Sequence, residues 1–261
     1  MPELPAVEVF KRYVDATSLH QKIVHVHTPK TKVLKSSGPT LRKKLTGRTL
    51  RGTERRGKYL FIDAGEGCWL VMHFGMTGKP RYFEREEEEP KHTRLRLDFE
   101  GGGHFAFDCP RMFGAVHVVD DIEAFARRKN LGPDALKVSR EEFVELFGGR
   151  KGQIKAALMR QDLICGLGNL WVDETLFQAK IHPKTRLEDL SARQLGRVYD
   201  LMCKVLKKII DVRGRSGDAP RTWLIHYREE GATCPRCAGR VESITAGGRR
   251  GYYCPGCQGV A

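Results

Sequence analysis

Four of the eight cysteines form two C-x-x-C pairs near the C-terminal end of the sequence. Cys234 and Cys237 make one pair, Cys254 and Cys257 the other, with 16 residues between the pairs. A two-residue gap lets two thiolates face one point, and a hairpin-sized spacer brings the second pair round to complete a tetrahedron. The spacing predicts one structural zinc ion with four sulfur ligands and no open position for chemistry. Redox dithiols or disulfides are the alternative.

The Pro2-Glu3 dipeptide is the second feature whose residue types could perform chemistry. We expect Met1 to be removed because proline follows it, and this removal exposes the secondary amine of Pro2. A neutral secondary amine can attack a carbonyl carbon and form an iminium that stays cationic, because its nitrogen has no proton left to lose. The iminium promotes elimination, and the adjacent Glu3 carboxylate can move the protons. A solvent-exposed chain start without a catalytic role is the alternative.

The hydrophobic pattern divides the chain into three regions. Residues 2–16 predict an amphipathic helix opened by Pro5. Short apolar or alternating runs in 22–120 predict an antiparallel β-sandwich or barrel, with strands at 22–26, 59–62, 69–72, 94–99 and 104–107. After Asp120 the period becomes helical, over 122–131, 140–148, 152–162, 169–178 and 190–212. The predicted fold is therefore a multidomain α+β protein, with a β-sandwich domain at 2–120, a helical domain at 121–227 and a zinc hairpin at 228–261.

The chain is strongly basic. Its 261 residues carry 46 lysines and arginines against 32 acidic residues, a formal net charge of +14. Such a surplus favours a polyanionic partner, with nucleic acid first, although a merely basic surface is the alternative. The longest apolar run, 68–76, is too short to cross a bilayer, and the charges in the first 20 residues exclude a secretory signal. We expect a cytoplasmic protein without a membrane partner.

Several short motifs occur in a fixed order along almost the whole chain. They are MPELPAVE at 1–8, GKYL at 57–60, HFGMTG at 73–78, PRMFG at 110–114, CGLGN at 165–169 followed by Asp173-Glu174, IHP at 181–183, and Arg249 within the cysteine hairpin that ends at Gln258. Together they resemble the formamidopyrimidine-DNA glycosylase/endonuclease VIII family of base-excision repair enzymes. Leu4 is closer to the formamidopyrimidine branch, since the other branch usually has glycine there. The resemblance implies a β-sandwich domain, a helix–two-turn–helix domain and a zinc finger.

The resemblance also implies a catalytic set. Pro2 is expected to be the nucleophile, Glu3 the proton donor and acceptor, and Lys58 a second proton donor near the sugar–phosphate. Arg249 is expected to be carried by the zinc hairpin to the phosphate that flanks the lesion. Without the resemblance, Lys58 would be one more exposed lysine at a strand edge and Arg249 a plain turn arginine.

A second set of residues is expected to face DNA. An enzyme that acts on a base must flip it out of the duplex and fill the hole, and by resemblance Met76, Arg111 and Phe113 fill it. His92, Arg150 and Lys155 match phosphate-contacting positions, and Asn169 adds a side-chain donor at a helix start. Taken alone, Met76 and Phe113 would be assigned to the core, and Asn169 would be an ordinary helix cap.

The sequence also departs from the family pattern. Ala6 replaces a usual glutamate, Cys109 stands where aspartate is usual, and Met112 replaces a common basic residue. The segment 212–227, which covers the flipped base in some relatives, is short, which disfavours recognition of 8-oxoguanine.

The expected function is a bifunctional DNA glycosylase and AP lyase. It removes oxidised or ring-opened bases through a Schiff base on the N-terminal proline and then cleaves the strand by β,δ-elimination. A non-catalytic damaged-DNA-binding protein, an endonuclease VIII-like glycosylase for oxidised pyrimidines, and a transcription factor using only the zinc region are the alternatives. The expected partner is double-stranded DNA with damaged bases or abasic sites, bound by a monomer without a nucleotide cofactor; in a bacterial host the protein would associate with the nucleoid.

Overall fold

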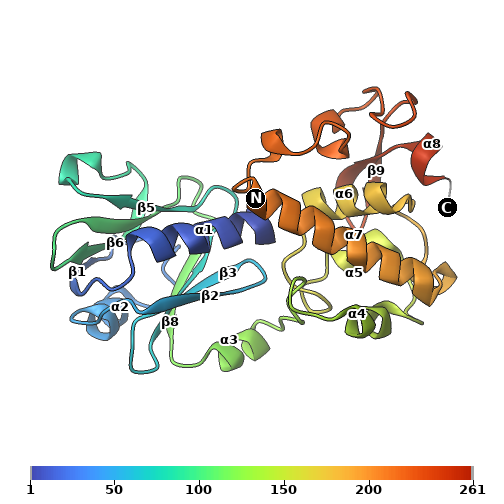
Figure 1. Ribbon diagram of the computed structural model, residues 1–261. Coiled ribbons are helices and arrows are strands. Elements are labelled where there is room, and N and C mark those ends of the chain that lie inside the picture. The colour runs from blue at the N-terminus through green and yellow to red at the C-terminus, as the bar shows by residue number, and fades with distance from the viewer. Residues whose placement is uncertain (1, 260–261) are drawn as a thin grey trace. The chain divides into compact units, whose positions relative to one another are not determined.

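The chain divides into two compact units, one ending at Lys129 and the other beginning at Asn130 (Figure 1). The computed structural model describes residues 2–259, so Met1, with its expected removal, and the last two residues of the predicted zinc region lie outside the described residues. Within 2–259 no helix is long and apolar enough to cross a membrane. The helical residues after 130 and the C-terminal hairpin share one unit, and the division into three regions stays a prediction.

The first unit is a β-sandwich of two four-stranded antiparallel sheets, which confirms the predicted architecture. One sheet has the order β1-β6-β7-β5 and the other β2-β3-β4-β8. The strands are β1 Ile23–His27, β2 Gly52–Arg56, β3 Tyr59–Asp63, β4 Trp69–His73, β5 Lys79–Phe83, β6 Thr93–Phe99, β7 His104–Asp108 and β8 Ala115–Val119; the helices are α1 Leu4–Thr17, α2 Gly38–Leu45, the 3-10 turn Glu86–Glu88 and α3 Ile122–Arg128.

The core of the first unit lies between the sheets and follows from strand alternation. On β3, Leu60 and Ile62 join the large apolar cluster, whereas Phe61 between them packs on the opposite face with Phe125 of α3. Because successive side chains of a strand point to opposite faces, a strand covered on both sides has apolar residues at every position. Helix α1 adds Val7 and Val14 to the same core.

Three strands that the sequence analysis did not name lie at sheet edges. Strands β2 (GTERR), β5 (KPRYF) and β8 (AVHVV) each border only one other strand. Edge strands carry charged residues and proline because one side faces solvent, so β2 and β5 lack an apolar run. Helix α2 was missed for a similar reason, since it buries only Leu41 and Leu45.

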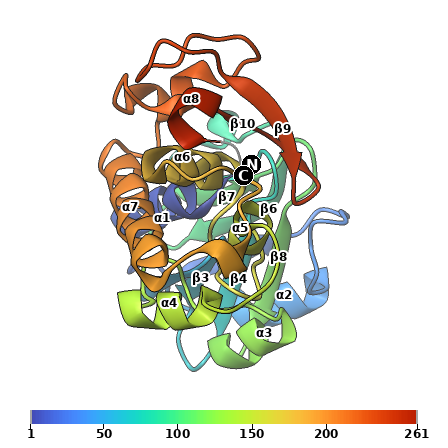
Figure 2. The same cartoon turned by 90° about the vertical axis from the view of Figure 1, so that its right-hand side faces the viewer.

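The second unit is mainly helical and contains a two-stranded hairpin close to its C-terminal end (Figure 2). Helix α7 packs against both α4 and α6. The elements are α4 Arg140–Phe147, α5 Ile154–Leu158, α6 Asn169–Ala179, α7 Ala192–Asp211, three 3-10 turns at Leu187–Asp189, Ser216–Asp218 and Leu224–Tyr227, β9 Glu242–Ala246, β10 Arg249–Tyr253 and α8 Pro255–Gln258. Helix α5 begins later than predicted because Gly152 has a φ of +110°, outside the helical region.

Two local devices fix the helix ends and the hairpin of the second unit. Ser139 and Ser191 each form a capping box at the start of α4 and α7. The β9–β10 turn consists of Gly247 and Gly248 with φ values of +59° and +68°. Two successive positive φ values define the turn that best matches strand twist, and glycine adopts them without strain. The spacer between the two cysteine pairs therefore forms the expected hairpin.

Candidate functional site

The predicted nucleophile and its neighbour lie at the start of α1. Glu3 has extended backbone (φ −104°, ψ 180°), and its carbonyl accepts a hydrogen bond from Val7 N at 3.2 Å. The Glu3 side chain does not cap the helix and is only 5% exposed, while Pro2 is half-buried. The positive end of the α1 dipole stabilises an anion and disfavours a protonated amine. This position therefore suits a neutral Pro2 amine beside a Glu3 carboxylate.

Lys58 lies in the tight turn between β2 and β3. Arg56 pairs with Tyr59, so Gly57 and Lys58 form a two-residue loop, and Gly57 supplies a φ of +57°. Lys58 is only 8% exposed, which contradicts the alternative of an ordinary exposed lysine. A lysine in so short a loop has its backbone fixed by the strands on both sides.

A partly buried ion pair links this turn to α1. Arg55 Nε donates to Glu8 Oε2 at 2.8 Å, and Arg55 Nη1 donates to the Gly57 carbonyl at 3.1 Å. Helix α1 packs on β2 and β3, so the pair ties the helix that begins beside Pro2 to the loop that carries Lys58. The sequence analysis quoted Glu8 only as part of a motif. An arginine far from Glu8 in sequence gives no signal of this contact.

His73 is a neutral imidazole near Lys58. Its pKa is lowered to about 4 by burial first, and then by the positive charges of Lys58 and Lys129. His73 Nδ1 accepts the Gly75 N–H at 3.2 Å, so the neutral ring carries its proton on Nε2. The ring faces Tyr59 across the β3–β4 ladder at 4.9 Å between centroids. His73 can therefore donate a hydrogen bond without adding charge.

Three apolar side chains stand out from the surface of the first unit; we call Met76, Met112 and Phe113 the apolar patch. Their exposed fractions are 42%, 36% and 55%, and they are the large hydrophobic residues that are exposed among residues 2–259. This exposure excludes the alternative that Met76 and Phe113 are core residues. Arg111 lies over the Phe113 ring at 5.5 Å. The predicted void-filling residues are Met76, Arg111 and Phe113, and they lie on two neighbouring loops.

Gly75 brings those two loops together. A Cβ placed on Gly75 would lie 2.3 Å from the Phe113 carbonyl carbon and 2.6 Å from Gly114 N, and Gly75 has a φ of +57°. Both the positive φ and the close backbone approach require glycine. The loop after β4, with Met76, is therefore held directly against the loop before β8, with Phe113.

Cys109 departs from the family pattern, but its backbone is held in place by hydrogen bonds. Cys109 is buried; its N–H donates to the His92 carbonyl at 3.0 Å, and its carbonyl accepts from Arg94 Nε at 3.1 Å. These bonds also place the half-buried His92 beside the Pro110 turn. Asp108, one place earlier, is buried and pairs with Lys79 at 3.6 Å.

In the second unit, Asn169 supports the strand that carries Arg249. Gly168 is the N-cap of α6 and Asn169 the first helical residue, so the alternative of an ordinary helix cap does not apply to its side chain. Instead Asn169 Nδ2 donates to the Arg250 carbonyl at 2.9 Å. Arg249 is exposed directly after the Gly247-Gly248 turn, and Arg150 is exposed after α4.

Lys155 requires a correction. We expected it to contact phosphate, but its side chain is 0% exposed and its Nζ lies 2.7 Å from Asp173 Oδ1. The same carboxylate binds Arg228 Nη1 at 2.6 Å and the Tyr252 N–H at 3.1 Å through Oδ2. A buried lysine needs such a partner to stay charged. This position contradicts a direct phosphate contact and assigns Lys155 to the support of β10.

Gly251 makes room for this buried charge cluster, which consists of Lys155, Asp173 and Arg228. A Cβ on Gly251 would lie 1.9 Å from Lys155 Nζ. The sequence analysis missed Asp173 as the organising residue, although an acidic pair within an otherwise apolar helix was a usable signal. The second acid of that pair, Glu174, is also buried and accepts the Ile225 N–H at 2.9 Å; burial raises its pKa to about 7.

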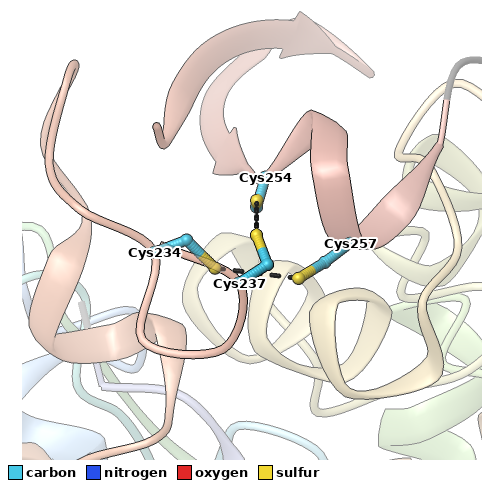
Figure 3. Close-up of side chains that lie close together, drawn as sticks. All are labelled: Cys234, Cys237, Cys254 and Cys257. Carbon is cyan, nitrogen blue, oxygen red and sulfur yellow. Dashed lines mark hydrogen bonds between the residues drawn. The ribbon is translucent and has the colours of Figure 1, made fainter. Parts of the chain in front are cut away.

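The four cysteines of the hairpin converge on one point (Figure 3). Cys234 and Cys237 come from the loop before β9, Cys254 and Cys257 from the end of β10 and α8. All four Sγ atoms lie within 4.8 Å of one another, with 3.7 Å between Cys234 and Cys257 and 3.4 Å between Cys237 and Cys254. Tetrahedral Zn–S bonds imply an S–S separation of about 3.8 Å. The cluster could therefore bind one metal ion.

Comparison with known proteins agrees with both units. Residues 1–116 match the family model described as the formamidopyrimidine-DNA glycosylase N-terminal domain, and residues 131–219 match its H2TH domain. These two domains define a DNA glycosylase of DNA repair. A formamidopyrimidine-DNA glycosylase from Lactococcus lactis subsp. lactis (strain IL1403) is 33% identical over 99% of both chains. One from Pelotomaculum thermopropionicum is 32% identical over the full length of both.

Solved structures show the same fold. The Lactococcus lactis formamidopyrimidine-DNA glycosylase bound non-covalently to DNA with an AP site has a TM-score of 0.90 at 29% identity, covering 99% of this chain and all of that one. A point mutant of the Lactococcus lactis enzyme in complex with Fapy-dG-containing DNA has a TM-score of 0.89, also at 29% identity and with the same coverage. The chain belongs to the formamidopyrimidine-DNA glycosylase family.

Proposed function

We propose that this protein removes oxidised or ring-opened bases from double-stranded DNA and then cleaves the strand as an AP lyase. The observation that carries the proposal is the pair at the start of α1: a buried Glu3 carboxylate directly follows Pro2 at the positive end of a helix. The relatives solved with AP-site and Fapy-dG DNA support the substrate class. The proposed order of substrate preference places ring-opened and oxidised purines first and oxidised pyrimidines second.

The residues of the first unit can perform the reaction in sequence. The neutral Pro2 nitrogen bonds to C1′ while the bond from C1′ to the damaged base breaks, and the base leaves with a proton. Glu3 moves protons as the sugar ring opens and the iminium forms. Loss of a C2′ proton then expels the 3′ phosphate, and a second elimination expels the 5′ phosphate. Lys58, held in its turn by Arg55, is the second proton donor.

The remaining predicted residues hold the DNA. Met76, Arg111 and Phe113 fill the space left by the flipped base, because inserted apolar side chains replace lost stacking. His92, Arg150, Asn169 and Arg249 contact phosphates, and Arg249 acts at the phosphate that flanks the lesion. A net charge of +14 supports binding to a polyanion.

We assign zinc to the four-cysteine cluster. Four thiolates at tetrahedral spacing match zinc preference. When bound, the ion would cross-link the two arms of the hairpin, and it has no open position for substrate. Cys234, Cys237, Cys254 and Cys257 would hold it, and the attached β10 would carry Arg249.

Borohydride trapping tests the proposal. Protein lacking Met1, incubated with abasic-site duplex and borohydride, should form a covalent adduct at the proline amine. A variant with an uncleaved residue before Pro2 should form none while binding the duplex with unchanged affinity. Glu3→Gln should lower base release more than 100-fold, on the scale of losing a general acid–base group. Absence of an adduct with Met1-free wild-type protein would overturn the lyase assignment.

The same assay separates the enzyme from a non-catalytic damage-binding protein, for which Ala6 and Cys109 are the motivation. That alternative requires tight binding to lesion DNA without release of any modified base. Catalytic turnover on a panel of duplexes with different lesions excludes it and also ranks the lesions.

A further inference from the structure

The connection between β1 and α2 is fixed beside the apolar patch. Val116 N donates to the Val33 carbonyl at 2.9 Å, and Lys35 N donates to the Val116 carbonyl at 2.8 Å. Val116 lies on β8, directly after the loop that carries Met112 and Phe113. These backbone bonds hold the end of the connection against the strand that follows the patch, so the side chains at 31 and 32 have a defined place relative to it.

Two side chains of this connection contact the patch. Lys32 Nζ lies 5.7 Å from the centroid of the Phe113 ring, and Thr31 Oγ1 lies 3.9 Å from Met112 Sδ. Arg111 lies over the same ring at 5.5 Å, so Phe113 is contacted by two cations. Lys32 is exposed, and no carboxylate pairs with it among residues 2–259. The connection therefore adds a positive charge at the border of the patch.

Met112 has a strained backbone conformation. Its φ is +52°, in the left-handed region that a side chain rarely adopts. Its N–H donates to the Cys109 carbonyl at 3.3 Å, which closes the turn, and its thioether side chain stands exposed at the surface. A strained residue that exposes an apolar side chain points to a functional contact. The flexible, polarisable methionine suits an aromatic surface.

We propose that Met112 and Lys32 form an additional DNA contact, beyond the residues that fill the void. Met112 packs on the face of a base next to the emptied position, and Lys32 neutralises a neighbouring phosphate. Nucleic acid fits both the apolar side chain and the cation, because a base offers an aromatic face and its phosphate lies within reach of a flanking cation. The inference rests on the proposed function and names two residues that determine how tightly the distorted duplex is held.

Binding measured at several salt concentrations tests the two roles separately. The probe is a duplex with a tetrahydrofuran abasic analogue, placed next to 2-aminopurine. Lys32→Gln should reduce the slope of log affinity against log salt by about 1, the value for one lost phosphate contact. Met112→Ala should leave the slope unchanged, weaken binding about tenfold and alter the 2-aminopurine fluorescence. Met112→Leu should restore most of the affinity.

A glycine variant provides a readout that a merely structural role would not produce. Met112→Gly relieves the positive φ, so its melting temperature should rise by about 3 °C while its affinity falls as in Met112→Ala. Lys43→Gln, on the exposed side of α2, is the matched control and should keep the wild-type slope.

Wild-type affinity in Met112→Ala, or an unchanged salt slope in Lys32→Gln, would overturn the proposal. Borohydride trapping of the wild type separates this failure from that of the proposed function. If the wild type traps and both variants bind like it, only the additional contact is wrong.

Discussion

The two units hold their candidate residues by different physical means. In the first unit, Lys58 and the predicted void-filling residues lie on connections between strands, where Gly57 and Gly75 permit the backbone geometry. In the second unit, Arg249 lies on a hairpin supported by a buried charge cluster and four thiols. Backbone turns depend little on ionisation or metal, whereas buried charges and thiolates depend on both. The units should therefore respond differently to the same perturbation.

Removal of the proposed zinc ion should have the largest effect, confined to the second unit. A chelator should release one metal ion per chain, abolish hydrogen-exchange protection of β9 and β10, and weaken binding to abasic DNA by about 100-fold or more, because binding energy of a structural zinc is folding energy. Protection of the β-sandwich should stay unchanged. Hydrogen-exchange mass spectrometry resolves the two units. Cys203→Ala, a cysteine outside the cluster, is the control and should retain the metal. A hairpin that stays protected after chelation would contradict this comparison.

Asp173→Asn should have the next largest effect. It leaves the buried Lys155 and the partly buried Arg228 without a carboxylate, which should lower the free energy of unfolding of the second unit by about 3–5 kcal/mol in urea titration. The double variant Lys155→Met with Asp173→Asn should recover most of this loss, because it removes one unpaired charge.

Asp162→Asn is the matched control for the buried cluster. It breaks a surface pair with Arg160 and should leave the unfolding free energy unchanged within error. If Asp173→Asn unfolds at the same urea concentration as this control, the cluster does not stabilise the hairpin.

Acidification should change the free energies of unfolding of the two units in opposite directions, by up to about 3 kcal/mol for each titrating group. In the first unit, the pKa values of His73 and His117 are about 4, below the ordinary 6.5, mainly because of burial. The unfolded chain binds more protons between these values, so stability falls as pH drops from 6.5 toward 4. In the second unit, Glu174 has a raised pKa of about 7, so the folded state gains the proton and stability rises between pH 7 and 4.5. Burial of His182 opposes part of that gain.

Unfolding measured at pH 5 and pH 7 in single variants checks these signs. His73→Asn, which keeps an acceptor for Gly75 N, should reduce the loss of stability of the first unit at acid pH. Glu174→Gln should reduce the gain of stability of the second unit over the same range. Equal pH dependence in each variant and the wild type would show that these groups do not set it.

The sequence predicted the elements whose signal is local. Strands β3 and β4 have continuous apolar runs, α7 has a capping box and helical period, and the cysteine pairs converge as their spacing indicates. Edge strands β2 and β5 were missed because half of each strand faces solvent and has no apolar pattern. The error at Lys155 has the same origin, since nothing near it in sequence shows that its side chain meets Asp173 inside the molecule.

By itself, the sequence determined the chemistry that is available: a proline next to glutamate, four cysteines spaced so that they could bind one metal ion, and an excess of cations for a polyanion. Those properties depend on residue type and short spacing. The tertiary structure decided which side chains are accessible and which are supports. It exposed Met76 and Phe113, buried Lys155, joined Glu8 to Arg55, and placed Lys32 beside Phe113. Each of these outcomes depends on how residues distant in the chain pack together, and packing alone establishes it.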